Sequence, residues 1–243
     1  MGNSNLLRAD GLVKTYNKRN VVDGVSIEVK KGQVVGLLGP NGAGKTTVFY
    51  MVVGLVFPNQ GKIFLGEEEI TSKHLFERAR MGVGYLPQEP SLFRKLSVYQ
   101  NIAMALEAQN LKSDDIKTRA DELIASFGLE KVQQSPASAL SGGERRRCEI
   151  ARCLAINPDF ILLDEPFAGI DPKAVLEIQK LIIELRQKNI GILITDHNVR
   201  ETLGSCDYAY LMNQGRVFLS GSPQAITESS EAREIYLGEG FRL

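Results

Sequence analysis

The stretch VVGLLGPNGAGKT, residues 34–46, decides the fold of this chain. Its first five residues are apolar and partly β-branched, which is typical of a buried strand. The glycines that follow, together with Lys45 and Thr46, complete the phosphate-loop pattern G-x-x-x-x-G-K-[ST], which joins a strand to a helix. A glycine-rich turn without a ligand is the alternative interpretation. The strand before the pattern and the helix expected after it favour an α/β protein that binds a nucleoside triphosphate.

This loop supplies both backbone and side-chain donors. Gly39, Gly42 and Gly44 allow backbone N–H groups to turn inward around phosphate oxygens. The N-terminus of the following helix adds partial positive charge there. We expect Lys45 to reach the β- and γ-phosphates and the Thr46 hydroxyl to ligate Mg²⁺. The residues expected to hold ATP in this loop are Gly39, Pro40, Asn41, Gly42, Ala43, Gly44, Lys45, Thr46 and Thr47.

Two carboxylates, Asp164 and Glu165, follow a second apolar run at residues 160–163. Neighbouring strand residues point to opposite sides, so the two carboxylates do different work if the strand continues through its end. Asp164 then faces Mg²⁺, and Glu165 acts on the attacking water as a general base. A helix N-cap pair is the alternative, and the preceding phosphate loop argues against it.

A rarer phosphate motif is the run Ser141-Gly142-Gly143-Glu144, which precedes a helical pattern. Ser and Glu at this spacing form a capping box. A cap does not need two glycines, each of which costs about 0.8–1 kcal/mol relative to Ala within a helix. Bare backbone at a helix N-terminus suits an approaching anion, so we expect both a cap and a phosphate contact. Two-fold pairing of chains would place this helix over the γ-phosphate of the other chain.

Composition limits the function classes. The chain has 243 residues, 43% of them hydrophobic, which is enough for one large domain or a core with a subdomain. Lys and Arg together number 29, as do Asp and Glu, so no broad positive field recruits nucleic acid. No apolar run is long enough to span a bilayer, and residues 1–4 begin no signal peptide. The three cysteines, Cys148, Cys153 and Cys206, lack metal-ligand spacing and are expected to be reduced, buried thiols.

The apolar pattern also indicates how the domain is organised. Residues 5–35 read as short strands, which predicts an antiparallel β subdomain. A helical pattern then predicts an inserted helical subdomain, at about residues 89–157, within a single domain spanning 1–243. Beyond it the pattern predicts strands at 160–163 and 191–195, a helix at 172–187 and a hairpin at 208–219.

The order and spacing of these motifs resemble those of ATP-binding cassette (ABC) ATPases over nearly the whole chain. The resemblance implies that Tyr16 stacks on adenine, that Gln88 senses Mg²⁺ and water, and that Asp171 lies along a dimer seam. It also implies that His197 is a switch residue contacting the γ-phosphate. The alternatives are an ordinary strand tyrosine at 16 and a surface or capping histidine at 197. Catalytic roles are thus expected for Lys45, Gln88, Glu165 and His197, and metal ligation for Thr46, Gln88 and Asp164.

Less general stretches look like the lipopolysaccharide-export branch of this family: residues 90–99, 141–147, 195–202 and the tail 236–243. That likeness implies a homodimer beneath a pair of integral membrane subunits, on the cytoplasmic face of a bacterial inner membrane. The chain would meet the membrane only through these partners. Leu92, Phe93 and Arg94 are expected to bind a membrane partner and Phe241 to pack near the dimer seam. Closure of the subdomain core by Phe93, and simple disorder of the tail, are the alternatives.

Two other functions stay open at this level. The ATPase of a branched-chain amino-acid importer has a similar cassette, and the tail and the Phe93-Arg94 segment argue against it. Soluble cassette ATPases of DNA repair, translation or iron–sulfur assembly form a different class. The sequence has no long coiled-coil insertion, second cassette or basic arm of the kind expected in that class.

Overall fold

The computed structural model describes residues 5–109, 111–238 and 240–241. Residues 1–4, for which no signal peptide was expected, lie outside the described residues, as do residues 242–243 of the tail. Within the described part of the chain, no helix is both long and apolar enough to cross a bilayer.

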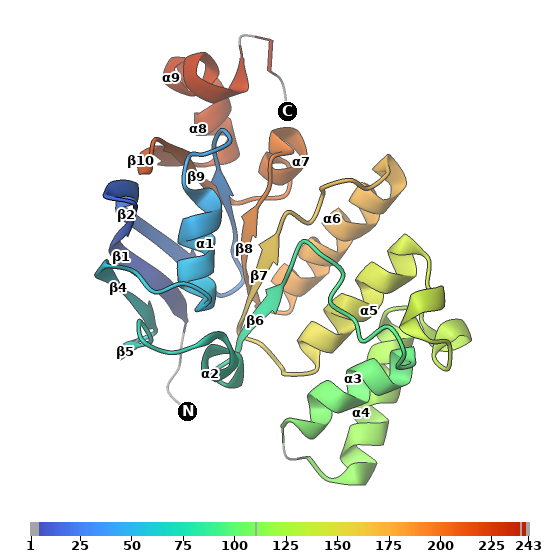
Figure 1. The fold of residues 1–243 in the computed structure, drawn as a ribbon. Helices are drawn as coiled ribbons and strands as arrows, with labels where there is room; N and C mark the ends of the chain where they lie inside the picture. Colours follow the sequence, from blue (N-terminus) through green and yellow to red (C-terminus); the bar gives the residue numbers. More distant parts are fainter. Residues whose placement is uncertain (1–4, 110, 239, 242–243) are drawn as a thin grey trace.

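A six-stranded sheet forms the core, with the strand order β10-β9-β3-β8-β7-β6 (Figure 1). Its strands β9, β3, β8, β7 and β6 run parallel, and β10 pairs antiparallel with β9. The predicted α/β fold is therefore confirmed. The strands are β3 (Val34–Leu38), β6 (Val83–Leu86), β7 (Phe160–Asp164), β8 (Gly191–Thr195), β9 (Tyr208–Asn213) and β10 (Arg216–Gly221).

A second sheet is antiparallel, in the order β2-β1-β4-β5, as the N-terminal pattern predicts. Its first two strands are longer than the short strands expected, because β1 and β2 stay paired across register shifts such as the one between Ala9 and Leu12. Bulges of this kind bend a strand without ending it. The strands are β1 (Leu6–Tyr16), β2 (Arg19–Lys30), β4 (Gln60–Leu65) and β5 (Glu68–Glu69).

The α-helices lie around these sheets (Figure 1). The predicted helix over residues 172–187 is present, and the hairpin between β9 and β10 turns through Gln214 and Gly215, both with positive φ. The helices are α1 (Lys45–Val53), α2 (Leu75–Arg80), α3 (Val98–Glu107), α4 (Ser113–Ser126), α5 (Gly142–Leu154), α6 (Pro172–Gln187), α7 (Val199–Leu203), α8 (Pro223–Glu228) and α9 (Ser230–Ala232). A π turn, Arg233–Leu237, follows α9.

The two faces of the central sheet carry different helices. Strand side chains alternate between faces, so Ile161 and Leu163 pack in one apolar cluster while Phe160 and Leu162 pack in another. The first cluster contains residues of α3, α4, α5 and α6, and the second contains α1 and the antiparallel sheet. Helices α1 and α5 therefore lie on opposite faces of the sheet (Figure 1).

A buried arginine fixes the far end of α1. Arg78 is fully buried, and its Nη1 donates to the carbonyl oxygens of Met51 and Val52 at 2.8 and 2.6 Å. Burial lowers the pKa of Arg78 to about 10, so it stays charged at neutral pH. A cation at a helix C-terminus satisfies the last carbonyls and complements the helix dipole. Helix α1 is thus anchored at the end away from the phosphate loop.

Candidate nucleotide site

The phosphate loop closes tightly on the rest of the protein. Gly39, Gly42 and Gly44 all have positive φ, at 148°, 79° and 99°. A Cβ on Gly39 would overlap with the carbonyl oxygen of Met212, and one on Gly44 would lie 2.5 Å from the carbonyl oxygen of Val21. Backbone conformation and close packing therefore both require glycine at these two positions.

Lys45 is buried at the start of α1, and its ammonium lies within the loop. Its Nζ donates to the carbonyl oxygens of Gly39 at 2.7 Å and Pro40 at 3.0 Å. Burial lowers the pKa of Lys45, and the negative charges of Glu165 and Asp196 oppose that shift. Because carbonyls are weaker partners for an ammonium than a phosphate is, this cation is suited to binding an anion in the loop.

Gln88, Glu165 and His197 come together at the carboxyl ends of three strands. The Gln88 amide donates to Glu165 Oε2 at 2.8 Å, and His197 Nδ1 lies 3.4 Å from the same oxygen. The three residues follow β6, β7 and β8, which are neighbours in the sheet. Ligand sites in parallel sheets lie at these strand ends. The structure thus brings three of the four residues expected to be catalytic, all but Lys45, into one constellation.

Glu165 does not continue the strand, so the condition attached to the sequence interpretation is not met. Strand β7 ends at Asp164, and Glu165 has φ of 45°, in the left-handed region. Its N–H donates to the carbonyl oxygen of Thr195 at 2.7 Å. A turn in the left-handed conformation, rather than strand alternation, separates the two carboxylates. Such a conformation costs a non-glycine residue about 1 kcal/mol or more, and it recurs at active sites.

Asp164 is buried at the end of β7. Burial raises its pKa, while hydrogen bonds from the Tyr50 and Tyr85 hydroxyls oppose that shift. Thr46 is exposed in the first turn of α1. Gln88 turns its amide nitrogen to Glu165, so its oxygen is the atom that can ligate a metal. A hydroxyl, a carboxylate and an amide oxygen are hard donors of the kind that Mg²⁺ prefers, so the residues fit that ion.

Helix α5 begins with the capping box expected from the sequence. Ser141 N–H donates to Glu144 Oε2 at 2.9 Å, and Glu144 N–H donates to Ser141 Oγ at 3.3 Å. These Ser141 hydrogen bonds hold the pKa of Glu144 below its ordinary value. A Cβ on Gly142 would meet nothing within 4 Å, and one on Gly143 would meet only side-chain ends. Packing within this chain does not require either glycine.

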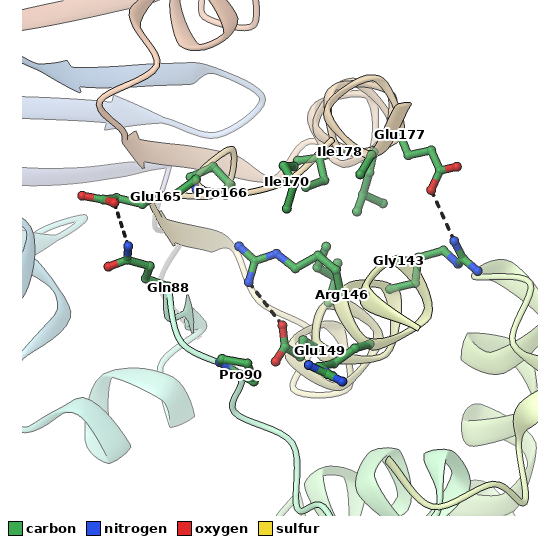
Figure 2. A pocket seen from close by; sticks show the side chains of 18 of the residues that line it. Gln88, Pro90, Gly143, Arg146, Glu149, Glu165, Pro166, Ile170, Glu177 and Ile178 are labelled. Carbon is green, nitrogen blue, oxygen red and sulfur yellow. Dashed lines mark hydrogen bonds and ion pairs between the residues drawn. The ribbon is translucent and has the colours of Figure 1, made fainter. Parts of the chain in front are cut away.

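A cavity of about 480 Å³ lies between this helix start and the Glu165 carboxylate. Figure 2 shows Gln88 and Glu165 at one end and Glu177 at the other. Glu177 pairs with Arg147 at 3.4 Å. Gly142, Gly143 and Asp171 also line it. Asp171 caps α6, accepting hydrogen bonds from the N–H groups of residues 173 and 174. The cavity separates α5 from α6.

Helix α5 is also tied to the loop that carries Gln88. Arg146 Nη1 donates to the carbonyl oxygen of Pro87 at 3.1 Å and pairs with Glu149 Oε2 at 3.2 Å (Figure 2). Glu149 Oε1 in turn accepts from the N–H of Ser91 at 2.8 Å, and Arg152 donates to the Ser91 carbonyl oxygen at 2.8 Å. Arg146 and Glu149 therefore pair with each other, while Arg152 is hydrogen-bonded to Ser91. Movement of α5 would therefore move this loop.

The residues expected to contact adenine or a protein partner differ in how exposed their side chains are. Tyr16 is 46% exposed at the end of β1, and the Lys14 ammonium lies 5.4 Å from its ring centroid. Phe93 is 52% exposed, so it does not close the subdomain core, and Arg94 beside it is exposed. Leu92 is buried in the helical cluster, so its side chain is not available to a partner. Phe241 packs on its own chain, with the Arg200 guanidinium 6.0 Å from its ring centroid.

Residues that the sequence analysis did not single out complete the site. Asp196 and Asn198 flank His197 and bond to the backbone of Phe167, and Tyr50 and Tyr85 bond to Asp164. These contacts join residues 29 or more positions apart. Their one sequence signal is that Asp196 and Asn198 stand beside a candidate switch residue.

Comparison with known proteins places this geometry in a family. The family model described as "ABC transporter" matches residues 22–168. The lipopolysaccharide export system ATP-binding protein LptB of Acidithiobacillus ferridurans is 55% identical over 240 residues, covering 99% of this chain and 100% of that protein. The protein of the same name in Escherichia coli K12 is 52% identical over 238 residues, covering 98% of this chain and 99% of that protein.

Solved structures agree. The ADP conformation of MJ1267, an ATP-binding cassette of an ABC transporter, has a TM-score of 0.85 at 27% identity and covers 96% of this chain and 99% of that one. The cbiO1 protein of Clostridium perfringens, part of the ABC transporter complex cbiONQ, has a TM-score of 0.84 at 32% identity and covers 94% and 92%. The fold of this chain is therefore that of ATP-binding cassettes. It carries the phosphate loop, the Gln88–Glu165–His197 constellation and the capped glycine helix start. The chain belongs to the ABC transporter family and is an ATPase of that family.

Proposed function

We propose that this chain is the ATP-hydrolysing subunit of an exporter that extracts lipopolysaccharide from the inner membrane toward the outer membrane. The observation that carries the proposal is the identity of 55% and 52%, over nearly the full length of both chains, to proteins named LptB. This identity extends beyond residues 22–168, the part that matches the general family model. It favours lipopolysaccharide export over the importer and the soluble alternatives.

In this proposal ATP is hydrolysed at Glu165. Its carboxylate accepts a proton from water as the water oxygen bonds to the γ-phosphorus and the bond to ADP breaks. Gln88 and His197, which both lie against Glu165 Oε2, hold that carboxylate and the water in place. Lys45 releases the carbonyl oxygens of Gly39 and Pro40 and turns to the β- and γ-phosphates. Tyr16 stacks on adenine, adding about 0.5–1.5 kcal/mol beyond area burial.

Thr46, Gln88 and Asp164 would hold Mg²⁺ with the nucleotide. The ion would supply positive charge against the phosphate oxygens. The buried carboxylate of Asp164 is kept in position by Tyr50 and Tyr85.

The working unit in this proposal is a homodimer. Because α1 and α5 lie on opposite faces of the sheet, the bare start of α5 does not cover the phosphate loop of its own chain. Two-fold pairing would let Ser141, Gly142 and Gly143 of each chain contact the γ-phosphate held by the other. Asp171, which caps α6 beside the same cavity, would lie along the seam.

The proposed membrane partners are an LptF/LptG-like pair of integral subunits, with this chain peripheral on their cytoplasmic face. Phe93 and Arg94 are the proposed anchors, on the helical subdomain of residues 89–157. Both side chains are exposed, while Asn101, fully buried, bonds to both the N–H and the carbonyl oxygen of Phe93 at 2.9 and 3.2 Å. An aromatic and a cation on a fixed loop are typical of an interface anchor.

The C-terminal tail has a narrower proposed role. Phe241 contacts Arg200 of α7, the helix that follows the His197 loop. We propose that the tail steadies the ATP-bound dimer through this helix. Deletion of residues 238–243 would then weaken ATP-driven dimerisation in sedimentation while leaving the nucleotide affinity of the monomer unchanged. Equal dimerisation constants with and without the tail would exclude this role.

Two substitutions test the proposed function. Glu165→Gln should lower ATP turnover at least about 100-fold while ATP still binds, because only the base is lost. Turnover within about threefold of wild type would refute the assignment of the base.

Phe93→Ala should abolish co-purification with the membrane subunits, whereas the isolated variant folds and binds ATP. With the membrane subunits in proteoliposomes, ATP should release lipopolysaccharide, and ATP-dependent uptake of a branched-chain amino acid instead would identify the importer.

A further inference from the structure

The loops after β7 and β8 are joined by a buried clamp. Asp196 is fully buried, and its Oδ2 accepts the N–H of Phe167 at 2.8 Å while its Oδ1 accepts the N–H of Asn198 at 2.8 Å. Asn198 Nδ2 donates back to the carbonyl oxygen of Phe167 at 3.0 Å. Asp196 and Asn198, in the loop after β8, thus bind the N–H and the carbonyl oxygen of Phe167, in the loop after β7. Phe167 itself is 2% exposed, so its backbone has no water to replace these partners.

The clamp lies beside both reacting side chains. Glu165 stands two residues before Phe167, and His197 stands between Asp196 and Asn198. On its N-terminal side Glu165 is held by the bond from its N–H to Thr195. On its C-terminal side the Glu165 carbonyl oxygen accepts the N–H of Ala168 at 3.2 Å, and the clamp holds Phe167 between these two residues. The left-handed backbone of Glu165 is thus restrained on both sides, as expected for a conformation that persists only where its surroundings determine it.

The side-chain geometry agrees with this reading of the clamp. His197 Nδ1 lies 3.4 Å from Glu165 Oε2 and 3.5 Å from Asp196 Oδ1, between the two carboxylates. A carboxylate can accept at both oxygens, whereas an asparagine amide has one acceptor oxygen and an NH₂ group that only donates. The clamp needs two acceptors, which accounts for an acidic side chain at a fully buried position. Without these bonds, burial of the carboxylate would be strongly unfavourable.

We propose that Asp196 is a positioning residue for ATP hydrolysis, which sets the distance between Glu165 and His197 by clamping the backbone of Phe167. In this role Asp196 acts through the backbone of the two loops, to which both of its carboxylate oxygens are bound. The inference rests on the proposed role of Glu165 as the base. Loss of the clamp should therefore lower kcat and leave the nucleotide affinity unchanged.

The test substitution is Asp196→Asn in the full chain, with Asp207→Asn as a matched control. Asp207 also accepts a backbone N–H, that of Val34 at 2.9 Å, and pairs with Arg186, but it lies just before β9, at the amino-terminal ends of the strands and away from the site. We expect kcat for Asp196→Asn to fall at least about tenfold, with KM and ATP affinity within about twofold of wild type. Asp207→Asn should retain wild-type kcat. An unchanged kcat, or an equal loss in both variants, would overturn the proposal.

A double mutant separates positioning from general destabilisation. If Asp196 acts through His197, then Asp196→Asn should lower kcat little further in a His197→Ala background. Multiplication of the two losses would contradict the proposal. Should Asp196→Asn fail to fold, Asn198→Ala removes only the bond to the Phe167 carbonyl oxygen and decides the question by the same kcat measurement. Activity of Glu165→Gln close to wild type would instead refute the proposed base, a different result from either of these.

Discussion

The starts of α1 and α5 both consist of glycine-rich backbone suited to phosphate. Packing within the chain requires glycine at the start of α1 but not at the start of α5. At α1, Gly39 and Gly44 have positive φ and face carbonyl oxygens of their own chain. At α5, Gly142 has open space where its Cβ would be, and a capping box shapes the helix start without it. The first site is formed by packing within one chain. The second lacks any internal reason for glycine, as expected where the missing surface belongs to a ligand on another chain.

Gly39→Ala should have the largest effect, because it disturbs the site that packing forms. The new Cβ would overlap with a backbone oxygen of β9, and its φ of 148° disfavours any side chain. We expect the free energy of unfolding to fall by about 3 kcal/mol or more, measured in urea. Gly128→Ala is the matched control, since Gly128 has φ of 60° and open space. A loss no greater than that of the control would remove the difference between the two helix starts.

Gly142→Ala should separate activity from stability. The free energy of unfolding should stay the same or rise by less than about 1 kcal/mol, because alanine is the better helix former. ATP turnover should fall at least about tenfold, since the methyl group blocks close approach of a phosphate. Turnover and urea unfolding on one preparation check both parts. Full turnover would mean that the start of α5 does not contact the nucleotide.

Ser141→Ala should have a smaller effect on α5. Loss of the bond from the Glu144 N–H to the Ser141 hydroxyl should cost about 1 kcal/mol of unfolding free energy. ATP affinity of the monomer should not change, because this helix start lies away from the phosphate loop of its own chain. Calorimetric titration with ATP measures that affinity. A weaker monomer affinity would place α5 at the nucleotide of the same chain.

The two cysteine thiols of α5, Cys148 and Cys153, should react slowly with alkylating reagents in the native protein. Burial raises the pKa of Cys148 and of Cys153 to about 12, above the ordinary value of about 8.5. A raised pKa keeps each thiol almost entirely neutral between pH 7 and 9, so alkylation should stay slow over that range. Iodoacetamide labelling followed by mass spectrometry should find both thiols unmodified until urea is added. Fast labelling of either thiol in the native protein would mean that this helix opens to solvent.

Local signals account for what the sequence predicts well. The phosphate loop, the capping box at Ser141 and the helix Pro172–Gln187 each depend on residues close together in the chain, and all are present. The left-handed backbone of Glu165 was not foreseen, because glutamate has no preference for it and the bond to Thr195 is long-range. The burial of Leu92 and the partners of Asp196 likewise depend on how distant elements pack. No periodicity in the sequence encodes them.

The loop that carries Gln88 has a mechanical consequence. It is held at Pro87 and Ser91 by side chains of α5 and at Phe93 by Asn101. Because these hydrogen bonds restrain the loop at three residues, we expect it to move as a unit rather than to deform. If the hydrogen bond between Gln88 and Glu165 lengthens or breaks during turnover, we expect Gln88 to carry the rest of the loop with it. Phe93 follows Gln88 by only five residues of this loop, so we expect a displacement of Gln88 to reach its exposed ring.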